Sequence, residues 1–268
     1  MNVKILGFLL LIITFLLLGY LVSYTGEVIE ERKEARVVRV IDGDTIEVNI
    51  SGTLEKVRLL DVNTPEKGEF YYKEASDFLN STLNEGMVYI EGNERDRYGR
   101  LLGYVFYNGK MINEQIIENG YGHFYSYQDS RYTDELKEAE EYARDNKIGI
   151  WQKSSNICSE CIILADFDSG KGRDDCEAGT EYAVFYNKCA QGCSLDGWNV
   201  KDRATHIYRF KNAVIDKDKK LILYNGIGND NGTTLYWQNK GCASLWNDAG
   251  DALFLRDKEG KLVLYYNY

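Results

Sequence analysis

The chain has fewer basic than acidic residues, a single proline and no cysteine before residue 158. Its 32 Lys and Arg face 42 Asp and Glu, a net charge of −10. Residues 35–152 alone carry 14 basic and 22 acidic side chains, a balance of −8. These numbers exclude a broad basic surface, so any nucleic acid must be bound at a local site that includes a metal ion. One proline and 44% apolar residues also exclude a disordered chain.

The N-terminus contains one long apolar run. Residues 5–22 carry no charge, Lys4 precedes them, and an acidic stretch follows. Eighteen apolar positions are about the minimum for a membrane-spanning helix. We therefore expect residues 1–24 to be a transmembrane anchor, with a cleaved signal peptide as the alternative, and residues 25–35 to be a charged spacer. The positive-inside rule then places both following domains outside the cytoplasm, or in the medium if the segment is cleaved.

The six cysteines lie in the C-terminal half, at Cys158, Cys161, Cys176, Cys189, Cys193 and Cys242. An even number outside the cytoplasm indicates disulfides. A zinc site from the Cys158–Cys161 and Cys189–Cys193 pairs also has suitable ligand spacing, and it would leave two cysteines over. Disulfides are the favoured interpretation, and the sequence does not give their connectivity.

Hydrophobic periodicity predicts two domains that are mainly β. In residues 36–152, alternating apolar residues indicate strands and 3.6-residue spacing indicates three helices. The predicted strands cover 36–62, 87–91 and 101–107, and the predicted helices cover 71–84, 111–119 and 134–146. We expect a small barrel with helices packed on it. After a polar linker at 153–159, short β runs separated by turns predict an antiparallel sandwich over residues 160–268.

The residues that suggest chemistry lie between Ile41 and Arg100. This stretch contains an Asp-Gly-Asp sequence at 42–44, Arg58, Thr64-Pro65-Glu66 and an Asp-Arg-Tyr-Gly-Arg turn at 96–100. Guanidinium groups neutralise phosphoryl oxygens, carboxylates bind hard cations, and a further carboxylate can handle an attacking water. Each motif alone is also typical of a hairpin turn or a surface cation. Their spacing together predicts hydrolysis of a phosphodiester.

In this spacing residues 36–151 resemble the staphylococcal-nuclease (thermonuclease) family. Five ordered motifs carry the resemblance, at 41–45, at Arg58 with Asn63, at 64–66, at 96–100 and at 148–151. The resemblance implies an OB-fold barrel of five strands with three helices. It also implies calcium-dependent hydrolysis of DNA or RNA that leaves 3′-phosphate ends.

The resemblance implies a metal site formed by Asp44, the backbone carbonyl of Thr64 and Asn63. The family often has an aspartate where this chain has Asn63, so one negative charge is lost and Ca²⁺ should bind more weakly. Asp61 would restore part of that charge if the strand continued as far as its position. On this interpretation, replacing Asn63 by aspartate would tighten calcium binding.

The resemblance also implies roles for three catalytic residues and one aromatic residue. Glu66 would position or deprotonate the attacking water, and Arg58 and Arg100 would bind the scissile phosphate. Tyr127 lies near a position where the family has a substrate-binding tyrosine. Independently of the resemblance, the place of Tyr98 between the two arginines of its turn suggests that it stacks on a base or ribose. His123, one of two histidines, is interpreted as a surface or core residue and not as a general base.

Residues 160–268 resemble a lamin-tail domain. The Asp-Gly-Trp-Asn-Val sequence at 196–200 and the Trp-Asn-Asp sequence at 246–248 carry this resemblance, which implies an immunoglobulin-like sandwich. We therefore expect an extracytoplasmic calcium-dependent endonuclease acting on single- or double-stranded DNA or on RNA. Its sandwich would serve binding or attachment to a partner that the sequence does not identify. The alternative is a non-catalytic module that binds nucleic acid or protein at the cell surface.

Overall fold

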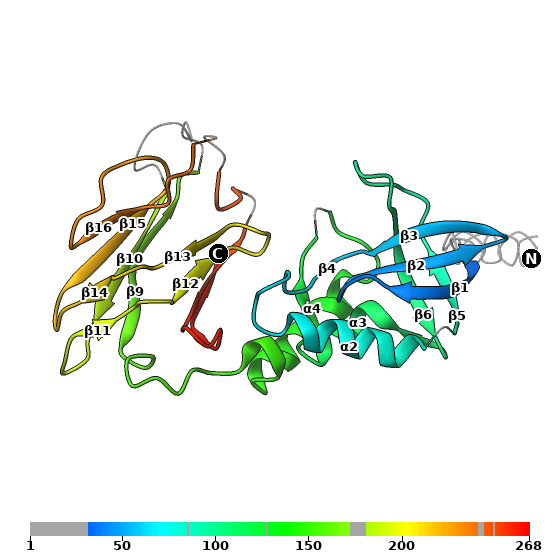
Figure 1. The fold of residues 1–268 in the computed structure, drawn as a ribbon, viewed down its shortest axis with the longest axis horizontal. Helices are drawn as coiled ribbons and strands as arrows, with labels where there is room; N and C mark the ends of the chain where they lie inside the picture. Colours follow the sequence, from blue (N-terminus) through cyan, green and yellow to red (C-terminus); the bar gives the residue numbers. More distant parts are fainter. Residues whose placement is uncertain (1–31, 85, 127, 172–180, 241–243, 249) are drawn as a thin grey trace, which may run out of the picture.

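The structure is a computed structural model that describes residues 32–84, 86–126, 128–171, 181–240, 244–248 and 250–268. They form two β-rich bodies that lie side by side (Figure 1). The expected membrane anchor at residues 1–24 lies outside the described residues. Among the described helices, none combines the length and the apolar character that crossing a bilayer requires.

The N-terminal body is a closed barrel. Its strand order is β3-β2-β1-β5-β6, and a parallel pairing of β3 with β6 closes it. The strands are β1 (Lys33–Val40), β2 (Thr45–Ile50), β3 (Thr53–Leu59), β5 (Met87–Glu91) and β6 (Leu101–Tyr107), and β7 (Lys110–Met111) extends the edge. The expected five-stranded, OB-like barrel is therefore confirmed.

Three helices lie together beneath the strands in the view of Figure 1, namely α2 (Tyr72–Leu83), α3 (Ile112–Glu118) and α4 (Thr133–Asp145). Each overlaps a helix predicted from apolar spacing. In α2, for example, Ala75, Leu79 and Leu83 recur every four residues and are fully buried. A short ribbon of β4 (Val62–Asn63) and β8 (His123–Phe124) lies beside the helices and carries residues of the predicted site.

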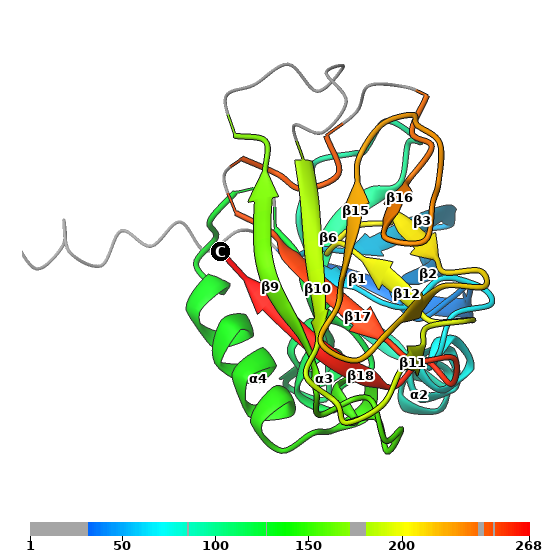
Figure 2. The same ribbon diagram turned by 90° about the vertical axis from the view of Figure 1, so that its left-hand side faces the viewer.

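The C-terminal body contains two four-stranded sheets (Figure 2). One has the order β16-β15-β10-β9, from β9 (Ile162–Ser169), β10 (Glu181–Asn187), β15 (Lys220–Tyr224) and β16 (Thr234–Tyr236). The other has the order β13-β12-β17-β18, from β12 (Asn199–Lys201), β13 (Ile207–Arg209), β17 (Ala252–Arg256) and β18 (Leu262–Asn267). A small ribbon pairs β11 (Cys193–Ser194) with β14 (Val214–Ile215). Buried aromatic side chains, among them Trp198, Trp246 and Phe185, fill the core of this body.

The expectation of a purely antiparallel sandwich is wrong at one edge. Strands β15 and β16 pair in parallel, with Leu223 opposite Leu235. The cause is the connection over residues 225–233, which returns the chain so that β16 starts at the same end of the sheet as β15. The other strand pairings described within this body are antiparallel.

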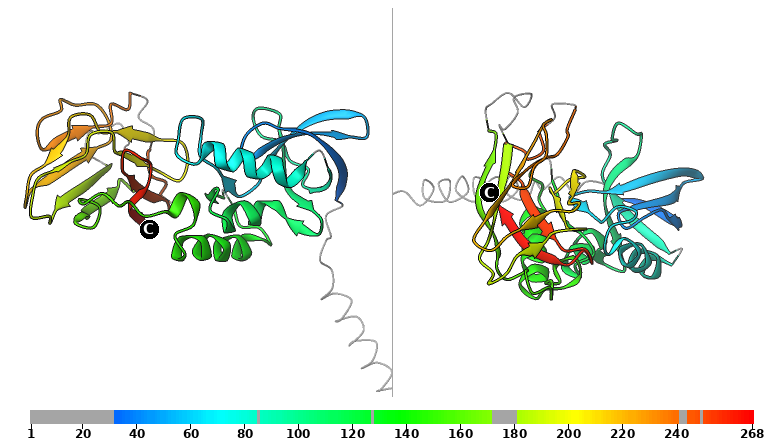
Figure 3. Two further views of the ribbon diagram at one scale, coloured as in Figure 1. Left: turned by 60° about the horizontal axis from the view of Figure 1, so that its bottom comes forward. Right: turned by 60° about the vertical axis from the view of Figure 1, so that its left-hand side comes forward.

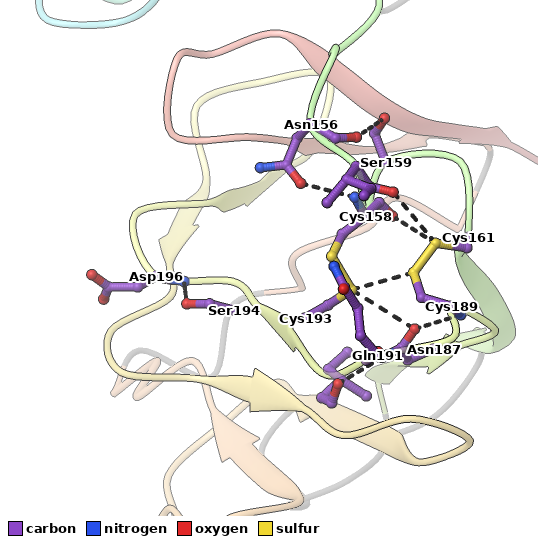
Figure 4. The surroundings of a disulfide bond; sticks show 12 residues. Asn156, Cys158, Ser159, Cys161, Asn187, Cys189, Gln191, Cys193, Ser194 and Asp196 are labelled. Carbon is purple, nitrogen blue, oxygen red and sulfur yellow. Dashed lines mark hydrogen bonds between the residues drawn. A yellow bond between two sulfur atoms is a disulfide. The ribbon is translucent and has the colours of Figure 1, made fainter.

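The predicted disulfides are confirmed for four cysteines. Cys158 bonds to Cys193 and Cys161 bonds to Cys189, so the segment before β9 is tied to the turn after β10 and to the start of β11 (Figure 4). The zinc alternative grouped these same four residues, and they do meet in space, paired as disulfides. Cys176 and Cys242 lie outside the described residues.

The two bodies share an apolar core. Trp151 and Ala143 of the first body pack with Ala252, Phe254 and Leu262 of the second, and Trp151 is fully buried. The predicted domain boundaries stay a prediction, since packing continues across them.

Candidate functional site

The loop between β1 and β2 carries two carboxylates, a half-buried one at Asp42 and a buried one at Asp44. A Cβ at Gly43 would lie 2.7 Å from both the Ala75 Cβ and the Thr64 Oγ1, so only glycine lets this loop approach α2. Asp44 is 7% exposed, and its Oδ2 accepts hydrogen bonds from the backbone N (3.0 Å) and Oγ1 (2.9 Å) of Thr64. Asp44 and Thr64, two of the residues predicted to bind the metal, are therefore in direct contact.

Asp42 is a functional candidate that sequence reasoning missed. Its Oδ1 accepts a hydrogen bond from the backbone N of Asp44 at 3.1 Å. Burial raises the pKa of Asp42, and the neighbouring Asp44 carboxylate raises it further. Two acids crowded in this way fit a bound cation, whose charge would offset their repulsion, and carboxylate oxygens are ligands that Ca²⁺ takes. The sequence signal for Asp42 is the Asp-Gly-Asp motif itself, of which only Asp44 is assigned to the predicted metal site.

Arg58 lies on β3 opposite Thr45 and is held firmly. Its Nε is 3.1 Å from Asp44 Oδ1, and its Nη1 donates to the carbonyls of Leu59 (2.5 Å) and Val62 (2.7 Å). A fourth contact runs from Nη2 to Asn63 Oδ1 at 3.3 Å. Three of the five guanidinium N–H groups therefore donate hydrogen bonds, and the ion pair with Asp44 restricts the orientation of the same group further.

Asn63 has partners in both bodies. It is buried, its Oδ1 accepts from Arg58, and its Nδ2 donates to the carbonyls of Arg203 (3.0 Å) and Ala204 (3.2 Å). This amide orientation gives a partner to both of its ends. The metal-ligand role of Asn63 stays a prediction. In this structure its side-chain oxygen accepts a hydrogen bond from the guanidinium group of Arg58.

The expected compensation by Asp61 is wrong. Strand β3 ends at Leu59, and Asp61 has φ 58°, so the alternation that would have aligned it with Asn63 is broken. Its carboxylate instead accepts from Tyr104 Oη (2.5 Å) and Ser130 Oγ (3.2 Å). Burial and then the bond to Asp61 raise the pKa of Tyr104, so the phenol stays protonated as a donor. Asp61 therefore contributes to the barrel's structure.

Glu66 lies in an exposed loop directly after the buried Thr64. Its backbone N donates to Glu69 Oε2 at 2.9 Å, and its carbonyl accepts from the backbone N of Glu69 at 2.8 Å. The loop is therefore a closed turn that leaves the Glu66 side chain in solvent. A carboxylate that is to handle an attacking water needs this access.

The predicted turn at 96–100 is formed as an Asp-centred loop. Asp96 Oδ1 accepts from the backbone N of Tyr98 and of Arg100, each at 2.9 Å, and Oδ2 accepts from Arg100 Nε at 2.7 Å. Burial opposes ionisation of Asp96, but these bonds outweigh it and lower its pKa. Tyr98 is 69% exposed, as a stacking residue requires. The parallel β3–β6 pairing sets Leu102, two residues after Arg100, opposite Arg58.

The last two predicted residues have different outcomes. Tyr127 lies outside the described residues. His123 is buried, and its Nε2 lies 2.5 Å from the carbonyl oxygen of Arg203. Burial holds the pKa of His123 well below its ordinary value, so the ring is neutral and donates through Nε2. Of the two expected placements of His123, at the surface or in the core, the structure has the second.

The second body also contacts the site, which the sequence did not predict. A cavity of about 270 Å³ lies between the bodies, and its lining includes Pro65, Glu69, Lys201, Arg209 and Arg256. In Figure 3 the cyan loop after β4 lies beside the yellow hairpin of β12 and β13. These contacts join residues more than 130 positions apart, and local sequence patterns carry no signal for them.

Comparisons with known proteins agree with the geometry. A family model described as staphylococcal nuclease homologue matches residues 56–153, and one described as lamin tail domain matches residues 160–268. Thermonuclease of Staphylococcus hyicus is 37% identical over 43% of this chain and 74% of its own length. Endonuclease YncB of Bacillus subtilis is 36% identical over 44% and 62%, and the SPbeta prophage-derived endonuclease YokF of the same organism is 33% identical over 48% and 47%. The chain thus spans less than two thirds of the length of these two Bacillus relatives.

Proposed function

Because this chain belongs to the staphylococcal nuclease family and carries a lamin-tail domain beside it, we propose that it is a calcium-dependent endonuclease of DNA or RNA. The observation that carries the proposal is the meeting of Asp44, Arg58 and Thr64. They come from three separate segments of the barrel, yet one carboxylate contacts both other residues within 3.1 Å.

We assign the cation to Asp42, Asp44 and the carbonyl of Thr64. When bound, Ca²⁺ would neutralise charge on the phosphoryl oxygens of the substrate. Arg58 and Arg100 would stabilise the negative charge that develops at phosphorus, and both are pre-oriented by carboxylates, Asp44 and Asp96. Glu66 would take the proton of the attacking water.

The contacts with the rest of the substrate are also part of this proposal. The exposed ring of Tyr98 would stack on a base or ribose, with the Arg97 guanidinium 4.8 Å from its centroid. Tyr127 stays a predicted substrate contact. The lamin-tail domain, for which we propose an immunoglobulin-like arrangement, would serve as an accessory unit.

The test uses the full chain and three substrates, single-stranded DNA, duplex DNA and RNA. Cleavage is expected with Ca²⁺ and is expected to stop with a chelator. Glu66→Gln should abolish cleavage with the fold intact, whereas Glu118→Gln, at an exposed position on α3, should not change it. Binding without cleavage in the wild type would instead support the non-catalytic module.

We also propose that both domains lie outside the cytoplasm. The uncharged run at residues 5–22 and the two disulfides support this, since disulfides persist in oxidising compartments. Protease added to intact cells should then digest the domains. Protection of the domains until the cells are lysed would contradict the proposal.

A further inference from the structure

The lamin-tail domain contacts both ends of the loop that carries Thr64 and Glu66. We call residues 63–69 the catalytic loop and residues 201–204 the docking segment. At one end, Asn63 donates to the carbonyls of Arg203 and Ala204. At the other end, Lys201 Nζ donates to Glu69 Oε2 at 2.6 Å, and both side chains are largely buried.

We propose that the docking segment is a positioning element of the nuclease site, which fixes the catalytic loop from the second domain. This inference rests on the proposed function and deepens it. The residues between the two contacts include a proposed cation ligand, Thr64, and the proposed base, Glu66. Fixing both ends of a seven-residue loop restricts the conformations available to those groups, and such pre-orientation is what catalysis requires.

The docking segment is itself anchored to the barrel. Arg203 forms a bidentate pair with Glu140 of α4, at 3.0 and 3.2 Å, and the two side chains are 14% and 6% exposed. Its guanidinium also donates to the carbonyl of Phe124 (2.8 Å) and to Tyr265 Oη (2.6 Å). A planar fork with several buried partners has one favourable orientation. The backbone of residue 203 is thus held against the barrel by its own side chain.

One carbonyl of this segment binds two adjacent residues of the barrel. Asn63 and His123 are opposite one another in the β4–β8 pairing, and both donate to the Arg203 oxygen. A Cβ at Gly122 would lie 2.8 Å from the Asn63 carbonyl oxygen, so glycine permits this close approach of the two strands. The contact therefore requires the local shape of the barrel as well as the amide of Asn63.

This geometry gives a reason for asparagine at position 63. An aspartate there would set a carboxylate oxygen about 3 Å from two carbonyl oxygens, where the amide now donates. The other end of the amide accepts from Arg58, so Asn63 links the docking segment to the phosphate-binding arginine. On this account Asn63 is a positioning residue. The docked domain disfavours an aspartate at position 63, which is why the site lacks that negative charge.

The test compares full-length wild type with Lys201→Met and Asn63→Asp. Hydrogen exchange measures protection of the backbone amides of residues 63–69, and steady-state cleavage of a short DNA oligonucleotide gives kcat and KM. We expect faster exchange in the catalytic loop of both variants, and a fall in kcat of about tenfold or more, with a smaller change in KM. Lys201→Arg should restore part of kcat. Lys211→Met, at an exposed position of the same domain, is the matched control.

Opposite results would overturn the inference. If the wild type cleaves DNA and both variants keep its kcat and its exchange pattern, the docking segment does not position the loop. If Asn63→Asp binds Ca²⁺ more tightly and keeps full kcat, Asn63 acts as a weakened metal ligand instead. A wild type that does not cleave any of the three substrates refutes the proposed function itself, which is a separate outcome.

Discussion

Replacing Arg203 by alanine should weaken the attachment of the lamin-tail domain to the barrel. The change removes one member of a buried ion pair and leaves the Glu140 carboxylate with the backbone N of Phe124, at 2.9 Å, as a remaining partner. Breaking a buried pair in this way costs about 3–5 kcal/mol. If the two bodies separated, water would solvate the Glu140 carboxylate and the unpaired charge would no longer be buried. The measured loss of stability therefore cannot exceed the free energy that holds the two bodies together.

The measurement is the free energy of unfolding of the full chain from urea denaturation, with the disulfides intact. Arg39→Ala is the matched control, because Arg39 also forms an Arg–Glu pair, with Glu47, but is 58% exposed. A surface pair contributes about 0.2–1 kcal/mol, so the control should change little. The double variant Arg203→Met with Glu140→Leu should regain part of the loss, because it leaves no unpaired charge although the N–H and carbonyl of Phe124 lose their partners. An Arg203→Ala protein as stable as the Arg39→Ala protein would refute the reasoning.

Three further predictions concern the barrel, the disulfides and pH. Gly43→Ala should cost about 1–3 kcal/mol and reduce activity, because its Cβ would overlap two neighbours at 2.7 Å; urea unfolding and a cleavage assay check this. Replacing Cys158 and Cys193 by serine opens a loop of 35 residues, which the loop-entropy model equates with a loss of about 4 kcal/mol of stability. The loss should be smaller than this, because the Cys161–Cys189 disulfide inside the same loop still restricts the unfolded chain. Thermal unfolding measures it. Since burial lowers the pKa of His123, the unfolded chain takes up a proton below about pH 6.5 that the folded chain does not, so stability should fall as pH decreases from there. His123→Gln, which keeps an N–H donor, should remove this part of the slope.

Each of these has an outcome that would contradict it. Full activity and stability in Gly43→Ala would mean that the loop can move away from α2 without cost. An unchanged melting temperature without the Cys158–Cys193 bond would show that the domain's core suffices. His206 acts in the opposite direction, because its bond to Asp202 raises its pKa and that stabilisation is lost as pH rises. The comparison must therefore be between His123→Gln and wild type, and identical slopes would show that His123 does not titrate as a buried group.

Local patterns predicted much of the fold and part of the site. The apolar spacing of α2 and the alternation of β2 each point to one buried face, and that face is what the barrel core requires. The meeting of Asp44, Arg58 and Thr64 follows from the family resemblance of their motifs, which implies that the three residues lie in one site. Asp61 was misplaced because a single residue with positive φ ends the strand, and alternation cannot show that.

The partners of Asn63 could not be predicted from the sequence. From the sequence, asparagine in place of the family's aspartate indicates only the loss of one negative charge. The sequence does not show which groups surround the side chain. The facing atoms are main-chain carbonyls 140 and 141 residues away, and a backbone oxygen has no residue type to recognise. The parallel β15–β16 edge was missed for a related reason, since strand direction depends on how a connection folds back.

The use of a main-chain oxygen to bind Asn63 bears on how such two-domain chains can be recombined. On the role proposed for Asn63, an aspartate at position 63 would set a carboxylate oxygen against two main-chain oxygens of this sandwich, while an asparagine can donate to them wherever the sandwich loop follows the same path. Compatibility between the modules thus depends on one amide in the first and on a backbone conformation in the second, together with the ion pairs of Lys201 with Glu69 and of Arg203 with Glu140. For anyone who builds chimaeras from these parts, position 63 is the first residue to match.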